Sequence, residues 1–230
     1  QGIAAGSIKA TGFADNFLAF PETGFADQTS AELQLTGEYG NFDFVTGLYD
    51  AEGRMLEQTE NLPILAFSLA PVCKHIKATF GDEIYPGDVF FHNDVFTLGN
   101  QNNDVAAFKP VFFEGRLVAW TAVKGHQADI GGAVAGGYNP NAVEVWQEAL
   151  RIPAVKIVER GKLRKDVWNL IFANVRLDIV QHDMKAEMGA CEVGARRLVA
   201  LLAKYGVDSY RAHKQALFDA INRVLLEPRR

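Results

Sequence analysis

A short stretch near the middle of the chain combines reactive side chains with two consecutive glycines. Residues 124–132 read Lys-Gly-His-Gln-Ala-Asp-Ile-Gly-Gly, which places His126 three residues before Asp129. Gly131 and Gly132 then end an apolar strand pattern, although neither a helix nor a strand interior favours glycine. An imidazole can transfer protons near neutral pH or bind a metal. Three interpretations follow: a metal site, a proton-transfer site, or a turn closed by hydrogen bonds.

A polar stretch upstream offers more side chains of the same kinds. It runs from residue 92 to residue 104 and holds few apolar residues between two apolar runs. Long polar loops on a folded scaffold often carry function. Its chemically useful side chains are His92, Asp94, Gln101 and Asp104. The catalytic candidates across both stretches are His126, Asp129, Asp94 and His92.

The strand pattern predicts that the two stretches meet. Apolar runs at 105–113 and 116–123 flank a turn signal at 114–115, which predicts an antiparallel hairpin. Asp104 and His126 lie nearly the same distance from that turn in sequence, so they should be neighbours at the open end of the hairpin. We expect the carboxylate and the imidazole within about 6 Å, close enough to share an ion or to interact electrostatically.

The elements around these stretches predict an α+β fold, with a mixed β-sheet core built from hairpins and a helical C-terminal third. Pro110 indicates a sheet edge or a bulge within its strand. Apolar spacing and turn signals predict a hairpin at 42–59 and a short strand at 88–92. Helices are expected at 65–81, 139–150, 165–175, 178–205 and 209–226.

The chain divides into two parts on composition. Residues 1–36 are rich in Gly, Ala, Ser and Thr and form an irregular N-terminal arm in this interpretation. Their phenylalanines follow no helix or strand period, so we expect them to pack on a partner chain. Residues 37–230 form the folded domain.

Composition excludes several classes of protein. The formal net charge of −5 argues against a nucleic-acid-binding protein, which usually has a basic face. No apolar run approaches the roughly 18 residues of a membrane span. Cys73 and Cys191 lie far apart without a CxxC spacing, which favours a reducing compartment. We therefore expect a cytoplasmic protein that binds neither nucleic acid nor membrane.

Several motifs together resemble the hydantoinase B/oxoprolinase family. They read YPGDVFFHND, PVFFEGRLVAWTAVKGHQADIGG, EALRIPAVKIVERGKLRKDVWNLIFANVR and GARRLVALLAKYG, and the similarity runs in the expected order from about residue 43 to residue 205. That family holds the B subunits of ATP-dependent hydantoinases, half of 5-oxoprolinase, and subunits of acetone and acetophenone carboxylases.

The resemblance implies a divalent metal, Mn or Zn, held by Gln101, Asp104 and His126. In the acetone carboxylase branch the first of these positions is a His, and here it is Gln101, a neutral and weaker ligand. Three interpretations stay open. The site binds a metal weakly through these three residues, it recruits His92, Asp94 or Asp129 instead, or it is a metal-free polar substrate site.

The resemblance also implies a reaction and a partner. It predicts the B-type subunit of an ATP-dependent cyclic-amide hydrolase of the hydantoin or 5-oxoproline type, in a hetero-oligomer with an A-type subunit that binds ATP. Nothing in the sequence matches the phosphate-binding pattern GxxxxGK[ST], which agrees with ATP on the partner. The alternatives are a ketone carboxylase subunit and a non-catalytic scaffold. Family chains are longer than this one, so we expect a partial version of the domain.

Overall fold

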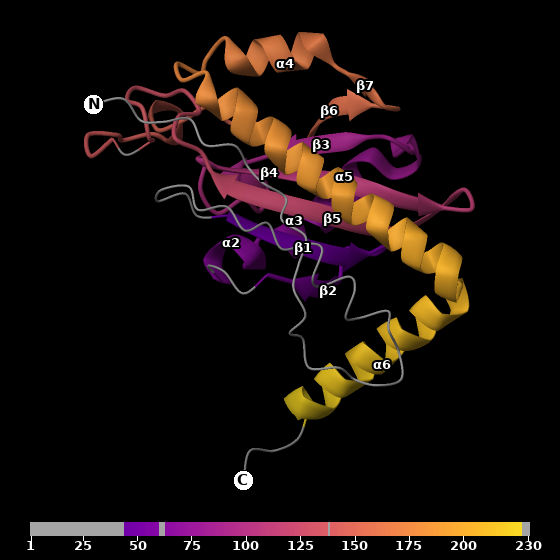
Figure 1. Ribbon diagram of the computed structural model, residues 1–230. Helices are drawn as coiled ribbons and strands as arrows, with labels where there is room; N and C mark the ends of the chain where they lie inside the picture. Colours follow the sequence, from indigo (N-terminus) through magenta and orange to yellow (C-terminus); the bar gives the residue numbers. More distant parts are fainter. Residues whose placement is uncertain (1–43, 60–62, 138, 227–230) are drawn as a thin grey trace, which may run out of the picture.

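The computed structural model describes residues 44–59, 63–137 and 139–226, and its centre is one antiparallel sheet. Figure 1 shows the sheet with helices on both of its faces. The strands occur in the spatial order β2-β1-β5-β4-β3-β6-β7. Their bounds are β1 (Phe44–Asp50), β2 (Met55–Gln58), β3 (Val89–His92), β4 (Asp104–Phe113), β5 (Arg116–His126), β6 (Val155–Glu159) and β7 (Lys162–Leu163).

The helices lie mainly in the C-terminal part. They are α2 (Pro63–Phe67), α3 (Leu69–Phe80), α4 (Lys165–Phe172), α5 (Ile179–Tyr205) and α6 (Val207–Leu226), with 3-10 turns η1 (Gly81–Glu83), η2 (Val95–Thr97) and η3 (Val145–Gln147). None of these described helices is both long and apolar enough to cross a membrane.

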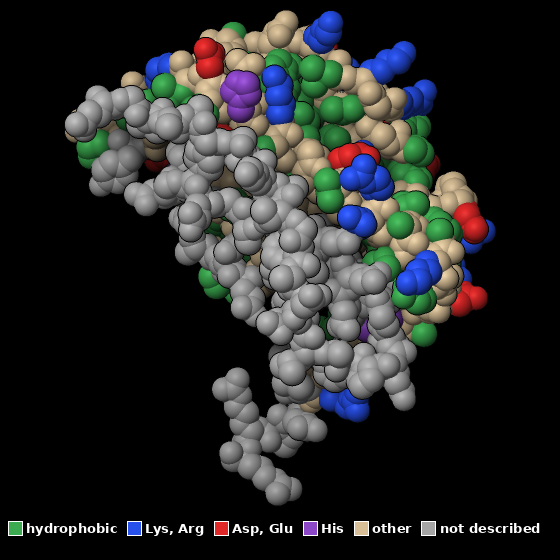
Figure 2. All heavy atoms as spheres, viewed as in Figure 1, with side chains coloured by type: hydrophobic (Ala, Val, Ile, Leu, Met, Phe, Trp, Pro, Cys, Tyr) green, Lys and Arg blue, Asp and Glu red, His purple; other side chains and the backbone are tan. Residues whose placement is uncertain are grey.

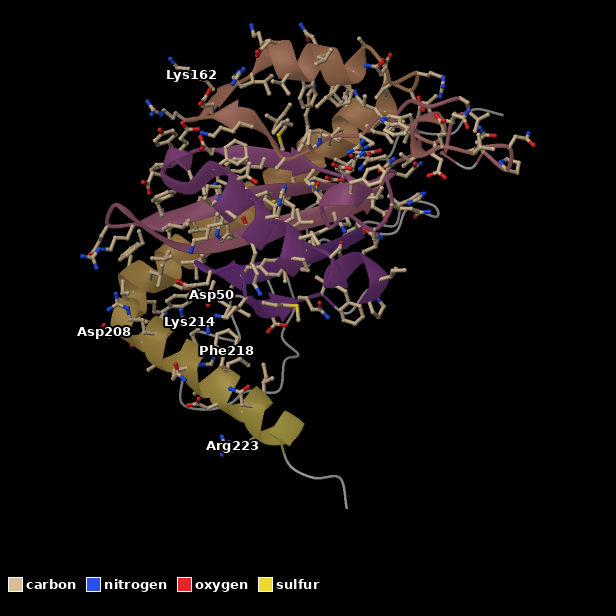
Figure 3. All side chains as sticks on the ribbon, turned by 180° about the vertical axis from the view of Figure 1, so that it is seen from behind. Asp50, Lys162, Asp208, Lys214, Phe218 and Arg223 are labelled. Atoms are coloured by element: carbon tan, nitrogen blue, oxygen red, sulfur yellow. The ribbon has the colours of Figure 1, made fainter. Side chains whose placement is uncertain are left out.

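Strand alternation sends side chains to two different hydrophobic layers. Phe90, Phe108 and Trp120 pack with residues of α2 and α3 on one face of the sheet. Val105 and Val123, from the same strands but of the opposite parity, pack with α5 on the other face. Figure 1 shows α5 crossing that second face, and Figure 3 shows α2 and α3 on the reverse.

The long helix α5 forms because its apolar residues recur every three or four positions. Its buried residues include Met184, Cys191, Leu198 and Leu202, and the helix ends before Gly206, whose φ is 83°. This is the helix predicted at 178–205. Cys191 is a free, buried thiol whose pKa burial raises to about 12, so it serves as a packing residue.

The last helix, α6, extends away from the sheet, and some of its side chains contact residues of the sheet. Figure 3 shows Lys214 and Phe218 of α6 on the side of the helix near Asp50, the last residue of β1. Lys214 Nζ lies 3.5 Å from Asp50 Oδ2, and the Arg54 guanidinium lies 4.4 Å from the centre of the Phe218 ring.

On the described part of the face seen in Figure 2, Lys and Arg side chains are spread over the surface.

The α+β class and the predicted hairpins are confirmed, and so is a bulge beside Pro110, but the sheet differs from the prediction. The sheet is not mixed, since all its strand pairs are antiparallel. Pro110 lies in the central strand β4, beyond the stretch 106–108 that pairs with β3 and just before a bulge at Val111 and Phe112. Its missing N–H is therefore tolerated.

The helix predicted at 139–150 is wrong, because η3 is the only helical turn in that described range. Side chains there satisfy the backbone in place of helical hydrogen bonds: Asn141 N donates to Asn139 Oδ1 at 3.1 Å, and Val143 N donates to Gln147 Oε1 at 2.8 Å. The predicted arm at 1–36 lies outside the described residues.

Candidate functional site

The register of three neighbouring strands places the polar residues together at one end of the sheet. His92 on β3 lies opposite Ala106 on β4, which lies opposite Lys124 on β5. Asp104 and His126 form the pair two residues further along β4 and β5, beyond Val105 and Gly125. Because alternate residues of a strand share a face, all four polar side chains project toward α2 and α3.

Asp104 and His126 are in direct contact. The imidazole Nδ1 lies 2.7 Å from the carboxylate oxygen Oδ1, within the range of a charge-assisted hydrogen bond. The side chain of Asp104 is 1% exposed and that of His126 is 34% exposed. The predicted proximity is therefore confirmed. A buried carboxylate favours the tautomer with the proton on Nδ1, which makes Nε2 the ring nitrogen that can accept one.

Lys124 belongs to the same site, although the sequence motifs did not identify it as a site residue. Its buried ammonium group donates to Asn100 Oδ1 at 2.7 Å and to the hydroxyl of Ser68, in the turn between α2 and α3. Asn100 Nδ2 in turn donates to Asp104 Oδ2. Burial lowers the pKa of Lys124 to about 8, and the nearby charge of Asp104 opposes that shift. The spacing could have indicated this, because Lys124 lies two residues before His126 in one strand and alternate residues share a face.

The loop after β3 forms a second polar group. His92 Nε2 lies 2.9 Å from Thr97 Oγ1, and Thr97 Oγ1 donates to Asp94 Oδ2 at 3.1 Å. Burial lowers the pKa of His92 to about 4; His75 and Lys124 add to this shift, and Asp94 opposes it. His92 is therefore neutral at pH 7 and acts there as a hydrogen-bonding group.

Arg151 holds the loop through a bidentate ion pair. Its Nε and Nη2 donate to the two carboxylate oxygens of Asp94 at 2.9 and 3.0 Å. Although burial raises the pKa of Asp94, these bonds and those from Phe96 N and Thr97 hold it below its usual range. The guanidinium also lies 4.4 Å from the centre of the exposed Phe96 ring. Asp94 thus positions the loop through its ion pair with Arg151.

Asp129 is hydrogen-bonded to the turn after β5 and to Arg176. It is fully buried, and it accepts hydrogen bonds from Gly131 N at 3.1 Å, from Arg176 N at 2.6 Å and from Arg176 Nη1 at 2.8 Å. Arg176 Nη2 also donates to the carbonyl of Gly132. These bonds join the segment before α5 to the turn after β5. The contacts of Asp129 therefore stabilise this connection.

The two glycines allow the backbone to pass other segments closely. Gly131 and Gly132 have φ of 82° and 83°, in the left-handed region that favours glycine. A Cβ at Gly132 would overlap the carbonyl of Glu148. The turn of residues 129–132 is therefore shaped by hydrogen bonds and by close packing.

A buried carboxyl group lies behind the site, on the α5 side. Glu187 Oε1 accepts a hydrogen bond at 2.6 Å from Nε2 of Gln127, the residue that follows His126 in the sequence. Burial raises the pKa of Glu187 well above its usual range, against the hydrogen bond from Gln127. A Cβ at Gly125 would lie 2.5 Å from Glu187 Oε1, so a larger residue at this position of β5 would have to displace the end of the Glu187 side chain.

The predicted metal ligands are only partly assembled. Asp104 and His126 are adjacent, but the side chain of Gln101 is exposed, and its backbone carbonyl accepts a hydrogen bond from Asp104 N at 3.1 Å. Within residues 44–59, 63–137 and 139–226, no three His, Cys, Asp or Glu side chains are grouped to hold a metal ion. Both oxygens of Asp104 already accept hydrogen bonds from side chains. Within the described part of the chain, Asp104 and His126 alone are too few ligands to fit a resident metal, whose sites usually have three or four.

The fold and the site define an α+β protein with a buried carboxylate–histidine pair at the end of an antiparallel sheet. A family model described as hydantoinase B/oxoprolinase matches residues 39–227. The chain belongs to the hydantoinase B/oxoprolinase family, as the motifs in the sequence indicated.

Known relatives include both hydrolases and carboxylases. The chain is 46% identical over 182 residues to caprolactamase subunit beta of Pseudomonas jessenii, covering 79% of this chain and 31% of the relative. It is 31% identical over 168 residues to the acetophenone carboxylase delta subunit of Aromatoleum aromaticum, covering 72% of this chain and 25% of the relative. The chain thus spans less than a third of the length of these relatives.

Solved structures agree on the fold. The crystal structure of ATP-dependent caprolactamase from Pseudomonas jessenii matches with a TM-score of 0.76 over 79% of this chain and 31% of that one. A nucleotide-free acetone carboxylase matches with a TM-score of 0.68 over 75% of this chain and 23% of that one, at 22% identity, which supports the fold alone.

Proposed function

We propose that this chain carries the site of a B-type subunit that completes the ATP-dependent hydrolysis of a cyclic amide, with an A-type subunit supplying the ATP site. The observation that carries the proposal is the contact of 2.7 Å between His126 and the buried Asp104. The 46% identity to a caprolactamase beta subunit supports a lactam as the substrate class.

The chemistry needs a base at the ring carbon. Once the amide oxygen has been phosphorylated, the ring carbon is open to attack by water, and that water must lose a proton. Asp104 fixes the Nδ1 proton of His126 and stabilises the imidazolium that forms when Nε2 accepts the proton from water. His126 suits this role because it is a third exposed while Asp104 is buried. Transfer by a positioned base contributes typically about 10²–10⁴ in rate.

Two other functions have specific support. The match to an acetophenone carboxylase subunit favours a ketone carboxylase, in which the same base would act beside an enol. The Gln at position 101, where the resemblance implies His, favours a non-catalytic scaffold. Substrate tests separate the first alternative, and a variant of His126 separates the second.

The test uses the protein that contains this chain, purified with its A-type subunit. ATP-dependent ring opening is measured with caprolactam, hydantoin and 5-oxoproline, and carboxylation is measured with acetophenone and bicarbonate. We expect His126→Gln to lower kcat for ring opening at least about 100-fold. The matched control is His182→Gln, at an exposed position of α5, and it should retain the parent rate. Full activity of His126→Gln would overturn the proposal.

A further inference from the structure

We propose that the buried ammonium group of Lys124 supplies at Asp104 the positive charge that a divalent metal supplies in a His/Asp/His site, so that this site works without a metal. The inference rests on the proposed function only in placing the reaction at Asp104 and His126. Its test measures metal binding and needs no activity.

The first observation is that the carboxylate of Asp104 is fully engaged. Oδ1 faces His126 Nδ1 at 2.7 Å, and Oδ2 accepts a hydrogen bond from Asn100 Nδ2. A metal bound at this carboxylate would have to share its oxygens with these two donors. A metal bound to both Asp104 Oδ1 and His126 Nδ1 would also have to replace the proton between them, because a coordinated nitrogen carries no hydrogen.

The second observation is the position of the ammonium group. Lys124 Nζ donates to Asn100 Oδ1 at 2.7 Å, and the amide of the same Asn100 donates to Asp104. The Asn100 side chain thus connects a buried cation to the buried anion. Lysine is almost never buried without a partner, and among the described residues the hydrogen-bond partners of Lys124 are neutral oxygens of Asn100 and Ser68. The charge that balances Lys124 is that of Asp104, with which it interacts electrostatically.

The third observation is the replaced ligand. Position 101 holds a neutral amide, and the Gln101 side chain is exposed. Two cations close to one carboxylate repel each other strongly where water is excluded. A chain that has lost an imidazole ligand and keeps a buried ammonium group near the remaining carboxylate therefore opposes binding of Mn²⁺ or Zn²⁺.

The experiment compares metal binding by three forms of the whole protein: the parent, Lys124→Met and Lys124→Arg. Each is dialysed against MnCl₂ or ZnCl₂ and then against buffer, metal content is measured by mass spectrometry, and affinity is measured by calorimetry. We expect the parent to retain no stoichiometric metal. Lys124→Met should bind Mn²⁺ at least about tenfold more tightly than the parent, and Lys124→Arg, which keeps the charge, should resemble the parent.

Two further measurements keep the result decisive. Asp104→Ala in the Lys124→Met background should abolish the gained affinity, which shows that the metal binds at this carboxylate. If Lys124→Met does not fold, Lys124→Gln removes the charge while keeping a polar group beside Asn100 and Ser68. Stoichiometric metal in the parent that is lost in Asp104→Ala would overturn the inference. Equal affinities in the parent and in a folded, charge-removed variant would also overturn it.

Discussion

Replacing Asp129 with alanine tests whether this residue stabilises the fold, as its contacts indicate, or takes part in the reaction. The buried carboxylate accepts hydrogen bonds from two backbone N–H groups, of Gly131 and Arg176, and from the Arg176 guanidinium. Asp129→Ala removes all three acceptor contacts at once. The two backbone donors then lose their partner beside a segment that joins the turn to α5.

The magnitude follows from these contacts. Removing one partner of a buried ion pair costs roughly 3–5 kcal/mol, and each hydrogen bond to a charged group contributes about 1.5–3 kcal/mol. Arg176 is 44% exposed, so its guanidinium regains water and the lower end applies. We expect Asp129→Ala to lower the free energy of unfolding by about 3 kcal/mol, which for a chain of this size lowers Tm by roughly 6–12 °C. Asp129→Asn keeps one oxygen acceptor and should lose about half as much.

The assay is urea unfolding followed by circular dichroism, with Asp166→Ala as the matched control. Asp166 also pairs with an arginine, Arg164, but its side chain is 66% exposed, so its loss should leave the urea midpoint nearly unchanged. The reasoning is refuted if Asp129→Ala unfolds at the same urea concentration as the parent. It is refuted equally if the variant loses lactam hydrolysis while its stability is unchanged, because Asp129 would then act in the reaction.

Two further predictions concern pH and backbone geometry. Because burial lowers the pKa of His92 from 6.5 to about 4, the folded state binds fewer protons than the unfolded state, and stability should fall by about 3 kcal/mol between pH 7 and pH 4. Urea unfolding across that range should show a smaller loss for His92→Gln, and equal losses would contradict the assignment. Gly132→Ala should destabilise the protein by more than about 1 kcal/mol, because φ is 83° and the new Cβ meets Glu148. Gly189→Ala, in α5 with open space around it, should instead stabilise the protein by about 0.5–1 kcal/mol, and a thermal melt that ranks the two variants the other way would be inconsistent with this geometry.

The contact between Asp104 and His126 could be predicted because hairpin register is local information. Once the turn at 114–115 is recognised, counting outward along two antiparallel strands pairs the two residues. The long helix α5 was predictable for a similar reason, since its apolar spacing is regular.

Contacts between distant segments could not be predicted in the same way. Arg176 reaches Asp129 across 47 positions, and nothing in the motif around either residue indicates the pairing. Ser68 meets Lys124 because the turn between α2 and α3 lies over the end of β5, and Asn100 reaches the same ammonium group from the loop between β3 and β4. The segment at 139–150 has helix-like composition, but hydrogen bonds from its own Asn and Gln side chains replace the helix.

A double-mutant cycle on Asp104 and His126 tests the central claim most directly. The measured quantity is kcat for ATP-dependent ring opening of the lactam by the complete complex, for the parent, Asp104→Asn, His126→Gln and the double variant. If Asp104 acts through His126, each single variant is slow and the double variant is no slower than His126→Gln alone. If the two losses multiply, or if His126→Gln turns over at the parent rate, the pair is not the working unit of this site.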